Sequence, residues 1–238
     1  MVSIAGSKKL KRQMAPKFWG ITRKEKRFVI TVRPGPHPKN YSIPSAVFLR
    51  DTLKHVTTLR EAKSSIYGGK IIVDGITRKS LHQGLGLMDV VELGGISEVY
   101  RLVPQDGHVL KPLKISENEK SKKLLKVISK TTIKGGKTQI GFHDGRSLIS
   151  DTKIDVGDSC LMQIPEQKIL DVIKLEKKAH VIVIRGINAG QAGTIEEIKE
   201  GSFILPKRVL VTLGERTIEI PTDLVMVVGK EKPVIQVR

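Results

Sequence analysis

One short segment has the residue types of a phosphate-binding loop. The string KGGKT at 134–138 supplies the Gly, Lys and Thr of such a loop, but the motif also requires Gly at the position of Thr131. An expected strand, TQIGF, follows this string, so no helix N-terminus is available to receive a phosphate. We therefore predict a hairpin turn here, which could touch RNA, and no nucleotide site.

Acidic residues, histidines and the single cysteine also lack the spacing of a reactive site. Aspartates gather at 144, 151, 155 and 158, but Asp144 and Asp158 lie in Gly turns, where Asp is favoured for local reasons. A calcium loop needs a tighter alternation of acids, and the six histidines are dispersed. Cys160 is alone, which excludes an internal disulfide and a zinc knuckle and favours a buried thiol. We predict no catalytic residue, no metal, no cofactor and no enzymatic activity.

Net charge is the strongest signal in the chain. There are 42 Lys and Arg against 24 Asp and Glu, a balance of +18, and residues 1–40 hold eleven of these bases and one acid. Such an excess repels itself unless a polyanion neutralises it, and nucleic acid is the usual polyanion. A membrane surface is the alternative, but the sequence has neither a basic amphipathic helix nor eighteen consecutive apolar residues. Without a signal peptide either, a cytoplasmic location is expected.

The basic segment should act as an arm on a folded body. Residues 1–27 show no sustained periodicity and alone should be disordered, because they bury too little apolar surface. Trp19 in this arm either plugs onto the neighbouring domain or stacks on RNA. A short strand is expected at 28–32, and the loop RPGPHPKN at 33–40 should be extended and stiff, with His37 as a polar loop residue.

Residues 41–106 predict a small α+β unit. Apolar residues at three- and four-residue steps indicate a helix at 43–56 (Ala46, Leu49, Leu53 and Val56). A second helix should begin at the capping box of Thr58 and Glu61, carry the apolar stripe Leu59, Ala62 and Ile66, and end at Gly68 and Gly69. A hairpin closed by Asp74 and Gly75 and two strands at 88–93 and 98–103 complete the unit.

From residue 107 the pattern changes to short strands separated by Gly turns. This spacing indicates two small barrels or sandwiches, one at 107–172 and one at 173–238. The expected fold is therefore α+β and mostly β. It consists of a basic N-terminal arm and Pro-rich loop (1–40), an α+β domain (41–106), a central barrel-like domain and a C-terminal barrel.

Two parts of the chain resemble known RNA-binding modules. The order of helix, capped helix, strand and V-D-G hairpin is similar to the S-four-type RNA-binding domain. Residues 179–198 are similar to the KOW motif of SH3-like barrels, with loop glycines Gly186, Gly190 and Gly193. Because Ala189 replaces the basic residue common before the central glycine, a phosphate contact would come from Arg185, Asn188 or backbone N–H groups.

The ordered combination of these modules carries a family resemblance. The strings APKFWGI, RPGPHP and GLGLMDVVEL, with the two modules, are similar to the archaeal/eukaryotic-type small-subunit ribosomal protein four (the S-four-e family), in its shorter archaeal form. The resemblance implies a structural constituent of the small ribosomal subunit in the cytoplasm. It also implies ribosomal RNA and neighbouring ribosomal proteins as partners, with no membrane, small-molecule substrate or homo-oligomer.

The predicted RNA-binding residues are basic side chains and a few loop residues from three segments. They are Lys8, Lys9, Lys11, Arg12, Lys17, Trp19, Arg23, Lys24, Lys26, Arg27 and Arg33 in the arm, Arg50, Lys54, Arg60, Lys63, Lys70, Arg78 and Lys79 in the α+β domain, and Arg185 and Asn188 in the KOW loop. Two alternatives remain: an RNA-modifying enzyme, which would need a larger catalytic domain, and a transcription factor that holds RNA polymerase through its KOW barrel.

Overall fold

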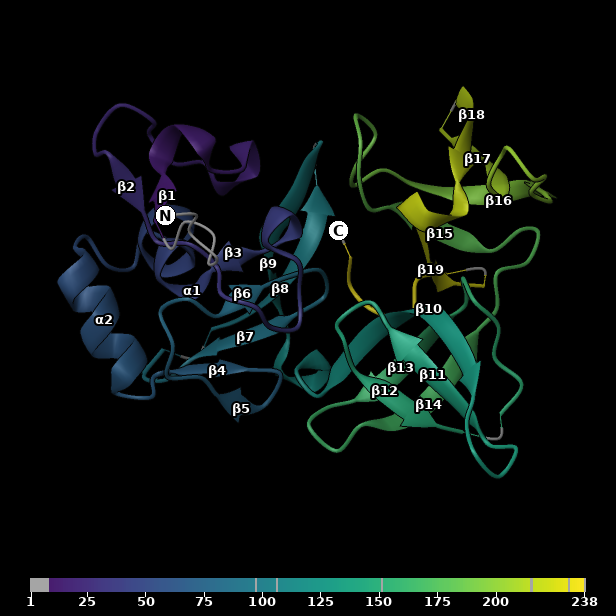
Figure 1. Cartoon of the computed structure of the whole chain (residues 1–238), viewed down its shortest axis with the longest axis horizontal. Helices are drawn as coiled ribbons and strands as arrows, with labels where there is room; N and C mark the ends of the chain where they lie inside the picture. The colour runs from purple at the N-terminus through teal and green to yellow at the C-terminus, as the bar shows by residue number, and fades with distance from the viewer. Residues whose placement is uncertain are drawn as a thin grey trace, which may run out of the picture.

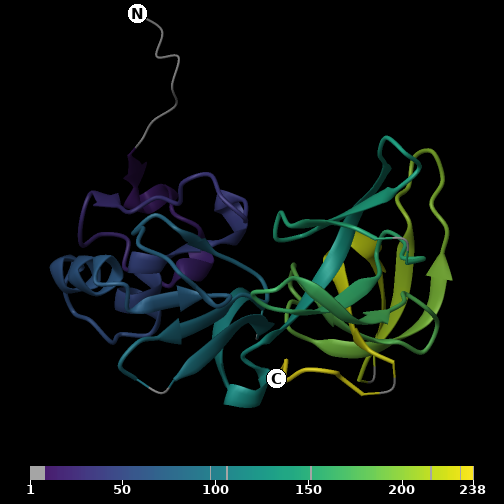
Figure 2. The ribbon, with the colours of Figure 1, turned by 90° about the horizontal axis from the view of Figure 1, so that it is seen from below.

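A computed structural model describes residues 9–96, 98–105, 107–150, 152–214, 216–230 and 232–237 of the chain. The arm and the α+β domain form one end of the molecule, and two five-stranded β domains form the other (Figures 1 and 2). This agrees with the predicted α+β, mostly β, fold. No helix in the described ranges has both the length and the apolar character needed to cross a membrane.

The arm folds back on itself instead of extending freely. Strand β1 (Leu10–Lys11) pairs antiparallel with β2 (Phe28–Val29), and 3₁₀ turns at Arg12–Met14 and Lys17–Trp19 lie between them. Leu10, Ala15 and Trp19 belong to the hydrophobic core of the α+β domain, so the arm's order comes from this docking. The strand expected at 28–32 is shorter than predicted.

The α+β domain contains a five-stranded sheet covered by two short helical segments. Its elements are a 3₁₀ turn (Lys39–Tyr41), β3 (Ile43–Pro44), α1 (Ser45–Val47), a π-helical turn (Phe48–Thr52), α2 (Leu59–Tyr67), β4 (Ile71–Val73), β5 (Ile76–Thr77), β6 (Gly84–Leu85), β7 (Val90–Leu93), β8 (Val99–Gln105) and β9 (His108–Ile115). The sheet order is β5-β4-β7-β8-β9, and β3 pairs with β6. The predicted hairpin at Asp74 and Gly75 is confirmed as the β4–β5 turn.

The prediction of one helix over 43–56 is wrong. The N–H groups of Ser45 and Ala46 donate to Gln83 O and Leu81 O, so α1 starts within tertiary contacts and continues as the π turn. Lys54 has a φ of 58°, which ends the helical path. The second helix is confirmed as α2, with its Thr58–Glu61 capping box, although Leu59 is 42% exposed and does not join the apolar stripe.

The boundary predicted after residue 106 falls inside a hairpin. Strand β9 pairs antiparallel with β8 from Val99↔Ile115 onward and forms the edge of the same sheet. Pro112 lies within β9, which hid the strand in the sequence but is tolerated at a sheet edge. The α+β sheet therefore extends to Ile115.

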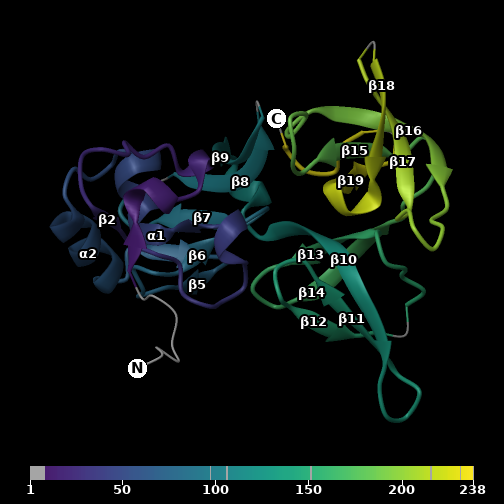
Figure 3. The ribbon, with the colours of Figure 1, turned by 45° about the horizontal axis from the view of Figure 1, so that its top comes forward.

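The last two sheets have the short strands expected from the sequence. The central sheet has the order β12-β11-β10-β13-β14, and the C-terminal sheet has the order β18-β17-β16-β15-β19 (Figure 3). In the central part these are a 3₁₀ turn (Glu117–Glu119), β10 (Lys122–Thr132), β11 (Thr138–Phe142), β12 (Ser147–Ile149), β13 (Ser159–Gln163) and β14 (Lys168–Ile173). The C-terminal part has β15 (His180–Val183), β16 (Ala192–Lys199), β17 (Arg208–Leu213), β18 (Arg216–Pro221), a 3₁₀ turn (Thr222–Leu224) and β19 (Val225–Gly229).

These two sheets share apolar packing. Leu124 and Leu161 of the central sheet and Val103 of β8 join the core that β15–β19 surround. Cys160 is buried in the central core, and burial raises the pKa of its thiol to about 12, so the prediction of a buried thiol is confirmed. The KGGK segment is the β10–β11 hairpin turn, as predicted, with positive φ at Gly135 and Gly136.

Candidate nucleic-acid interface

The aromatic side chain of the arm anchors it to protein. Trp19 is 1% exposed, and its indole N–H donates to the carbonyl oxygen of Ser42 at 2.9 Å. A buried tryptophan that also satisfies its N–H is a packing residue. The alternative of Trp19 stacking on RNA is therefore wrong, and Trp19 instead fixes where the arm lies.

Arg12 also turns inward. Its side chain donates to Thr22 O, to Thr22 Oγ1 at 3.3 Å and to Glu25 Oε2 at 3.2 Å, and the residue is 3% exposed. A hydrogen bond from Thr22, and then the charge of Arg12, lower the pKa of Glu25. The one acid of the arm is thus occupied by Arg12, and the predicted RNA contact of Arg12 is corrected to an internal one.

The remaining cations of the described arm point to solvent. The eight other described bases predicted here to bind RNA are all exposed: Lys9, Lys11, Lys17, Arg23, Lys24, Lys26, Arg27 and Arg33. Lys39 of the Pro-rich loop, which was not among the predicted residues, is exposed as well. Five of the eight (Lys11, Arg23, Lys24, Lys26 and Arg27), with Gln13 and Glu25, line a surface hollow of about 440 Å³. Lys8 lies outside the described residues. Docking through Trp19 thus holds many positive charges on one folded surface, which is the footprint expected for a phosphate backbone.

Two exposed aromatic side chains accompany these cations. Phe28 is flanked by Lys9 Nζ at 5.7 Å and by the Arg27 guanidinium carbon at 5.3 Å from its ring centre. Tyr67, at the end of α2, has Lys63 Nζ at 5.7 Å from its ring centre. Exposed aromatic faces beside cations can stack unpaired bases while the cations meet phosphates. Neither Phe28 nor Tyr67 was predicted from the sequence, although Arg27 directly precedes Phe28 and Lys63 lies four residues before Tyr67.

Helix α2 presents the basic face that the sequence predicted. Arg60 and Lys63 are both exposed, whereas Ala62 and Ile66 are buried against the sheet. The capping box fixes the start of the helix and therefore the direction in which these cations project. Lys63 and Tyr67 follow each other by one helical turn, which extends this face along the helix.

The other predicted cations of the α+β domain differ in their availability. Arg50 is half-buried and donates twice to Asp51, at 3.1 and 2.7 Å, so its charge is already paired. Lys54 is exposed and lies beyond the π turn that holds Arg50, at a positive φ that takes it off the helical path. Lys70 and Lys79 are exposed, and Arg78 is half-buried, beside the β4–β5 hairpin.

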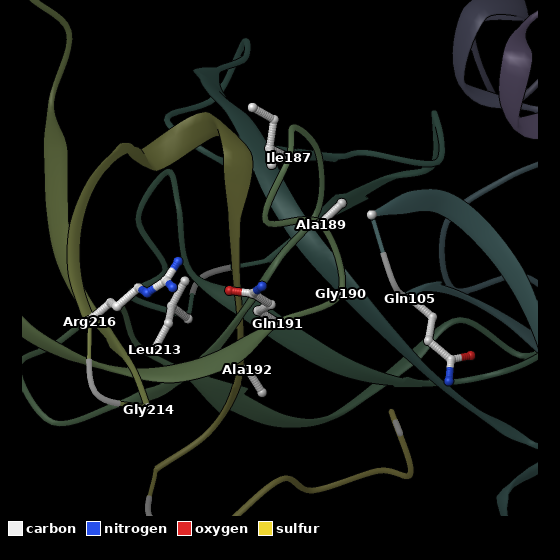
Figure 4. Close-up of a pocket in the computed structure, with 10 residues that line it drawn as sticks. Gln105, Ile187, Ala189, Gly190, Gln191, Ala192, Leu213, Gly214 and Arg216 are labelled. Carbon is white, nitrogen blue, oxygen red and sulfur yellow. The ribbon is translucent and has the colours of Figure 1, made fainter.

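The loop between β15 and β16, for which the sequence predicted a KOW motif, lies on the other half of the molecule and contacts the α+β domain. Gly107 N–H donates to Ala189 O at 2.9 Å, and a Cβ on Gly190 would lie 2.4 Å from Gln105 Cα. With its φ of 87°, Gly190 is therefore needed both for the turn and for this close approach. Figure 4 shows the adjoining hollow of about 680 Å³, with Arg216 along one side.

The two KOW-loop residues predicted to meet RNA do not line this hollow. The guanidinium of Arg185 lies 3.6 Å from the ring centre of Tyr41, which ties the C-terminal barrel to the segment after the Pro-rich loop. Asn188 is half-buried, and its carbonyl accepts from Gln191 N–H within the loop. Arg185 also lines a pocket with His37 and Pro38, so it lies at the end of the Pro-rich loop.

A second group of charged residues is buried between domains, and we call it the junction cluster: Asp74, Asp89, Lys123, Asp144 and Arg146. Lys123 is fully buried, and its Nζ lies 2.6 Å from Asp74, 2.6 Å from Asp89 and 3.2 Å from Asp144. Arg146 reaches Asp74 at 2.7 Å and Asp144 at 3.0 Å. The cluster joins the β4–β5 turn and the start of β7 to the central sheet.

The charges in this cluster compensate one another. Burial opposes the charge of Lys123, but the carboxylates of Asp89, Asp74 and Asp144 outweigh it and raise the pKa of the amine. Burial would also raise the pKa of Asp89, yet Lys123 and then His37 hold it well below its usual range. For Asp74, burial dominates and the pKa is raised. Lys123 therefore remains charged as the centre of an internal ionic network.

Histidines connect this network to the arm and to the C-terminal barrel. His37 lies in the loop, as predicted, but it is buried, with Nε2 3.0 Å from Asp89. His143 accepts from Lys126 N–H through Nδ1 at 3.1 Å, and its Nε2 lies 3.1 Å from Leu87 O. The next buried amine, Lys126, donates to the carbonyls of Thr222, Asp223 and Val225, which links the central sheet to the last strands.

The local roles predicted for two aspartates are confirmed. Asp144 accepts from Arg146 N–H at 3.1 Å, and Asp158 accepts from Asp155 N–H and Leu175 N–H. Asp144 nevertheless has the additional ionic role in the junction cluster. Within the described ranges, no three His, Cys, Asp or Glu side chains gather in a way that could hold a metal ion.

Two family models match the chain. A model described as Ribosomal family S4e matches residues 96–169, and a model described as the RS4NT (NUC023) domain matches residues 5–40, the arm and Pro-rich loop. The small ribosomal subunit protein eS4 of Methanothermobacter thermautotrophicus is 38% identical, over 99% of this chain and 98% of its own length. The protein of the same name from Korarchaeum cryptofilum is 37% identical over the full length of both chains.

A solved structure is similar as well. The crystal structure of the 30S ribosomal protein S4e from Thermoplasma acidophilum matches with a TM-score of 0.69 at 36% sequence identity. The match covers 81% of this chain and 97% of that chain. The structural similarity therefore extends over most of this chain and nearly all of that chain.

Proposed function

The chain belongs to the ribosomal protein family S4e, and from this premise we propose that it is a structural constituent of the small ribosomal subunit that binds ribosomal RNA in the cytoplasm. The observation that carries the RNA-binding part is the docked arm. Eight exposed bases surround an arm whose one acid is occupied by Arg12. Phosphate contacts from these bases would supply most of the affinity, and the folded body would set their register.

The proposed interface combines the arm with the exposed face of α2. The eight arm bases, with Arg60 and Lys63, would contact phosphates. Phe28 and Tyr67 would stack on unpaired bases. The relatives are ribosomal proteins by name, and we propose a non-catalytic role for this chain with ribosomal RNA and neighbouring ribosomal proteins as partners. The KOW character of residues 179–198 is part of this proposal; the strand–loop–strand shape of β15 and β16 supports it.

Salt dependence of binding to small-subunit ribosomal RNA tests the proposal. Each phosphate neutralised by the protein contributes about 0.7 to 0.9 to the slope of log affinity against log salt. Replacing Lys24, Lys26 and Arg27 with Gln is expected to reduce that slope by about two to three. A matched control replaces Lys153, Lys168 and Lys174 with Gln, three exposed lysines in the central domain or directly after its last strand.

The control loses the same three charges, but from positions outside the arm. Its slope of log affinity against log salt should therefore change much less. Equal slopes for the two variants would show that net charge, and not the arm, determines binding. A flat salt response of the unaltered protein would contradict the proposed function itself.

A further inference from the structure

The hairpin between β16 and β17 exposes an apolar tip. Phe203, Ile204 and Leu205 are 106%, 85% and 49% exposed, and they follow one another in the chain. The hairpin belongs to the C-terminal sheet, at the end of the molecule away from the arm (Figure 1). Single exposed apolar residues are common on proteins, but three in succession on a projecting turn indicate a contact surface.

The tip has a defined shape. Ser202 N–H donates to Leu205 O at 2.8 Å, and Leu205 N–H donates to Ser202 Oγ at 3.2 Å. At the base of the tip, Lys207 Nζ pairs with Glu200 at 2.8 Å, and Lys207 O accepts from Thr222 N–H at 3.1 Å. The turn is therefore closed by its own hydrogen bonds, and the three apolar side chains are preorganised for contact with a partner.

Charge distinguishes this tip from the arm. Residues 192–213 contain three Glu and three Lys or Arg. All three cations have carboxylate partners: Lys199 and Arg208 pair with Glu219 at 2.9 and 3.1 Å, and Lys207 pairs with Glu200. The tip thus offers a polyanion little attraction, whereas the exposed Glu196 and Glu197 on β16 of the same hairpin would complement a basic rim.

We propose that Phe203, Ile204 and Leu205 dock into an apolar groove with a basic rim on another protein of the small ribosomal subunit. This inference rests on the proposed function, because the partner belongs to the same particle. Phe203 is the central anchor, as aromatic side chains buried in a pocket dominate most protein interfaces. A second copy of this chain is disfavoured as the occupant, because two molecules of charge +18 repel each other.

Photocrosslinking within assembled small subunits tests the docking. A benzophenone amino acid replaces Phe203 in one full-length variant and Met14, an exposed residue of the arm, in another. We expect position 203 to crosslink to one other protein of the subunit and position 14 to crosslink to ribosomal RNA. Crosslinks from 203 to RNA, to a second copy of this chain or to nothing would overturn the docking.

The two positions separate this inference from the function on which it rests. If both variants assemble and position 14 crosslinks RNA, failure at position 203 overturns the docking alone. If the unaltered chain is absent from small subunits, the proposed function fails and the docking fails with it.

A second pair of variants gives a readout without a probe. Replacing both Phe203 and Ile204 with Ser should leave thermal unfolding and RNA affinity unchanged, since both side chains are exposed. Subunits carrying this variant should lose the crosslinked partner at least threefold more readily in a salt wash. The control replaces Ile149, an exposed residue of β12, with Ser and should retain the partner. Equal retention by the two variants would overturn the docking.

Discussion

The arm and the junction cluster use the same residue types in opposite ways. In the arm, the exposed bases surround a single acid, and docking through Trp19 holds them outward. In the junction cluster, Lys123 is fully buried and three carboxylates lie within 3.2 Å of its amine. Net charge in the sequence therefore combines charges that the fold neutralises with charges left for a partner, and only the second kind can bind RNA.

This difference in burial also means that the junction cluster should affect the stability of the fold, whereas the arm should affect RNA binding. A buried ionic network stabilises only while it is complete, because removing one partner leaves charges uncompensated in a medium that solvates them poorly. Exposed cations, by contrast, contribute little to folding and are screened by salt. Mutations in the two regions should therefore affect different measurements.

Replacing Lys123 with Met should give the largest loss of stability. The substitution keeps most of the side-chain volume but leaves Asp74, Asp89 and Asp144 without their common cation. We expect the free energy of unfolding, measured with urea, to fall by about 3 to 5 kcal/mol. Lys130→Met is the matched control, because Lys130 forms an exposed pair with Asp155 at 2.9 Å. The control should lose less than about 1 kcal/mol.

Similar losses for Lys123→Met and Lys130→Met would show that the junction cluster contributes no more than a surface ion pair. RNA affinity under conditions where both variants are folded should be unchanged, since neither lysine belongs to the arm or to α2. A selective loss of affinity in folded Lys123→Met protein would contradict the division between the two regions.

His143 should make stability depend on pH between about 6.5 and 4. Burial, and then the charge of Lys123, lower the pKa of His143 to about 4, and its Nδ1 already accepts a hydrogen bond from Lys126 N–H. The unfolded chain therefore binds a proton at higher pH than the native one, and stability falls as the pH decreases through this range. The expected contribution is roughly 1 to 3 kcal/mol.

Comparing the pH profile of the unaltered protein with that of a His143→Gln variant isolates the contribution of His143. The carboxyls of the junction cluster also titrate: the lowered pKa values of Asp89 and Asp144 make stability fall on the acid side, whereas the raised pKa of Asp74 acts in the opposite direction. The unaltered protein reports the sum of these contributions and that of His143. His143→Gln should show a shallower decline between pH 6.5 and 4 in urea unfolding. Identical pH profiles for the two proteins would rule out the titration of His143 as a cause.

Elements whose formation depends on residues close together in the sequence were predictable. The Thr58–Glu61 capping box, the Asp74–Gly75 turn and the short strands of both β domains were found from local patterns and are confirmed. The helix expected over 43–56 was not, because the path widens into a π turn, with Leu53 N–H bonded to Phe48 O, and ends at the positive φ of Lys54. Strand β9 was missed because Pro112 breaks a strand pattern unless the strand lies at an edge.

The candidate site was predictable in composition but not in orientation. Exposure of the arm cations and of Arg60 and Lys63 agrees with their expected availability, whereas Trp19 and Arg12 turn inward through contacts with residues 10 to 23 positions away. The junction cluster brings residues 74 and 144 together, so no local window contains it. Lys123 stands beside the exposed Lys122 at the start of β10, before the apolar residues of the strand, so the local sequence does not mark it as the buried one of the two.

Replacing both Arg60 and Lys63 with Ala should give the smallest effect and the sharpest separation of binding from folding. Both side chains project from α2 into solvent, and Ala favours a helix, so the free energy of unfolding should change by no more than about 0.5 kcal/mol. Loss of two phosphate contacts should weaken RNA binding by about three- to tenfold at moderate salt and reduce the salt slope by one to two. Lys168 and Lys174, replaced with Ala, provide the control of equal charge. Unchanged affinity in the α2 variant would confine the interface to the arm, because the remaining cations of this end of the molecule would then suffice without the helix.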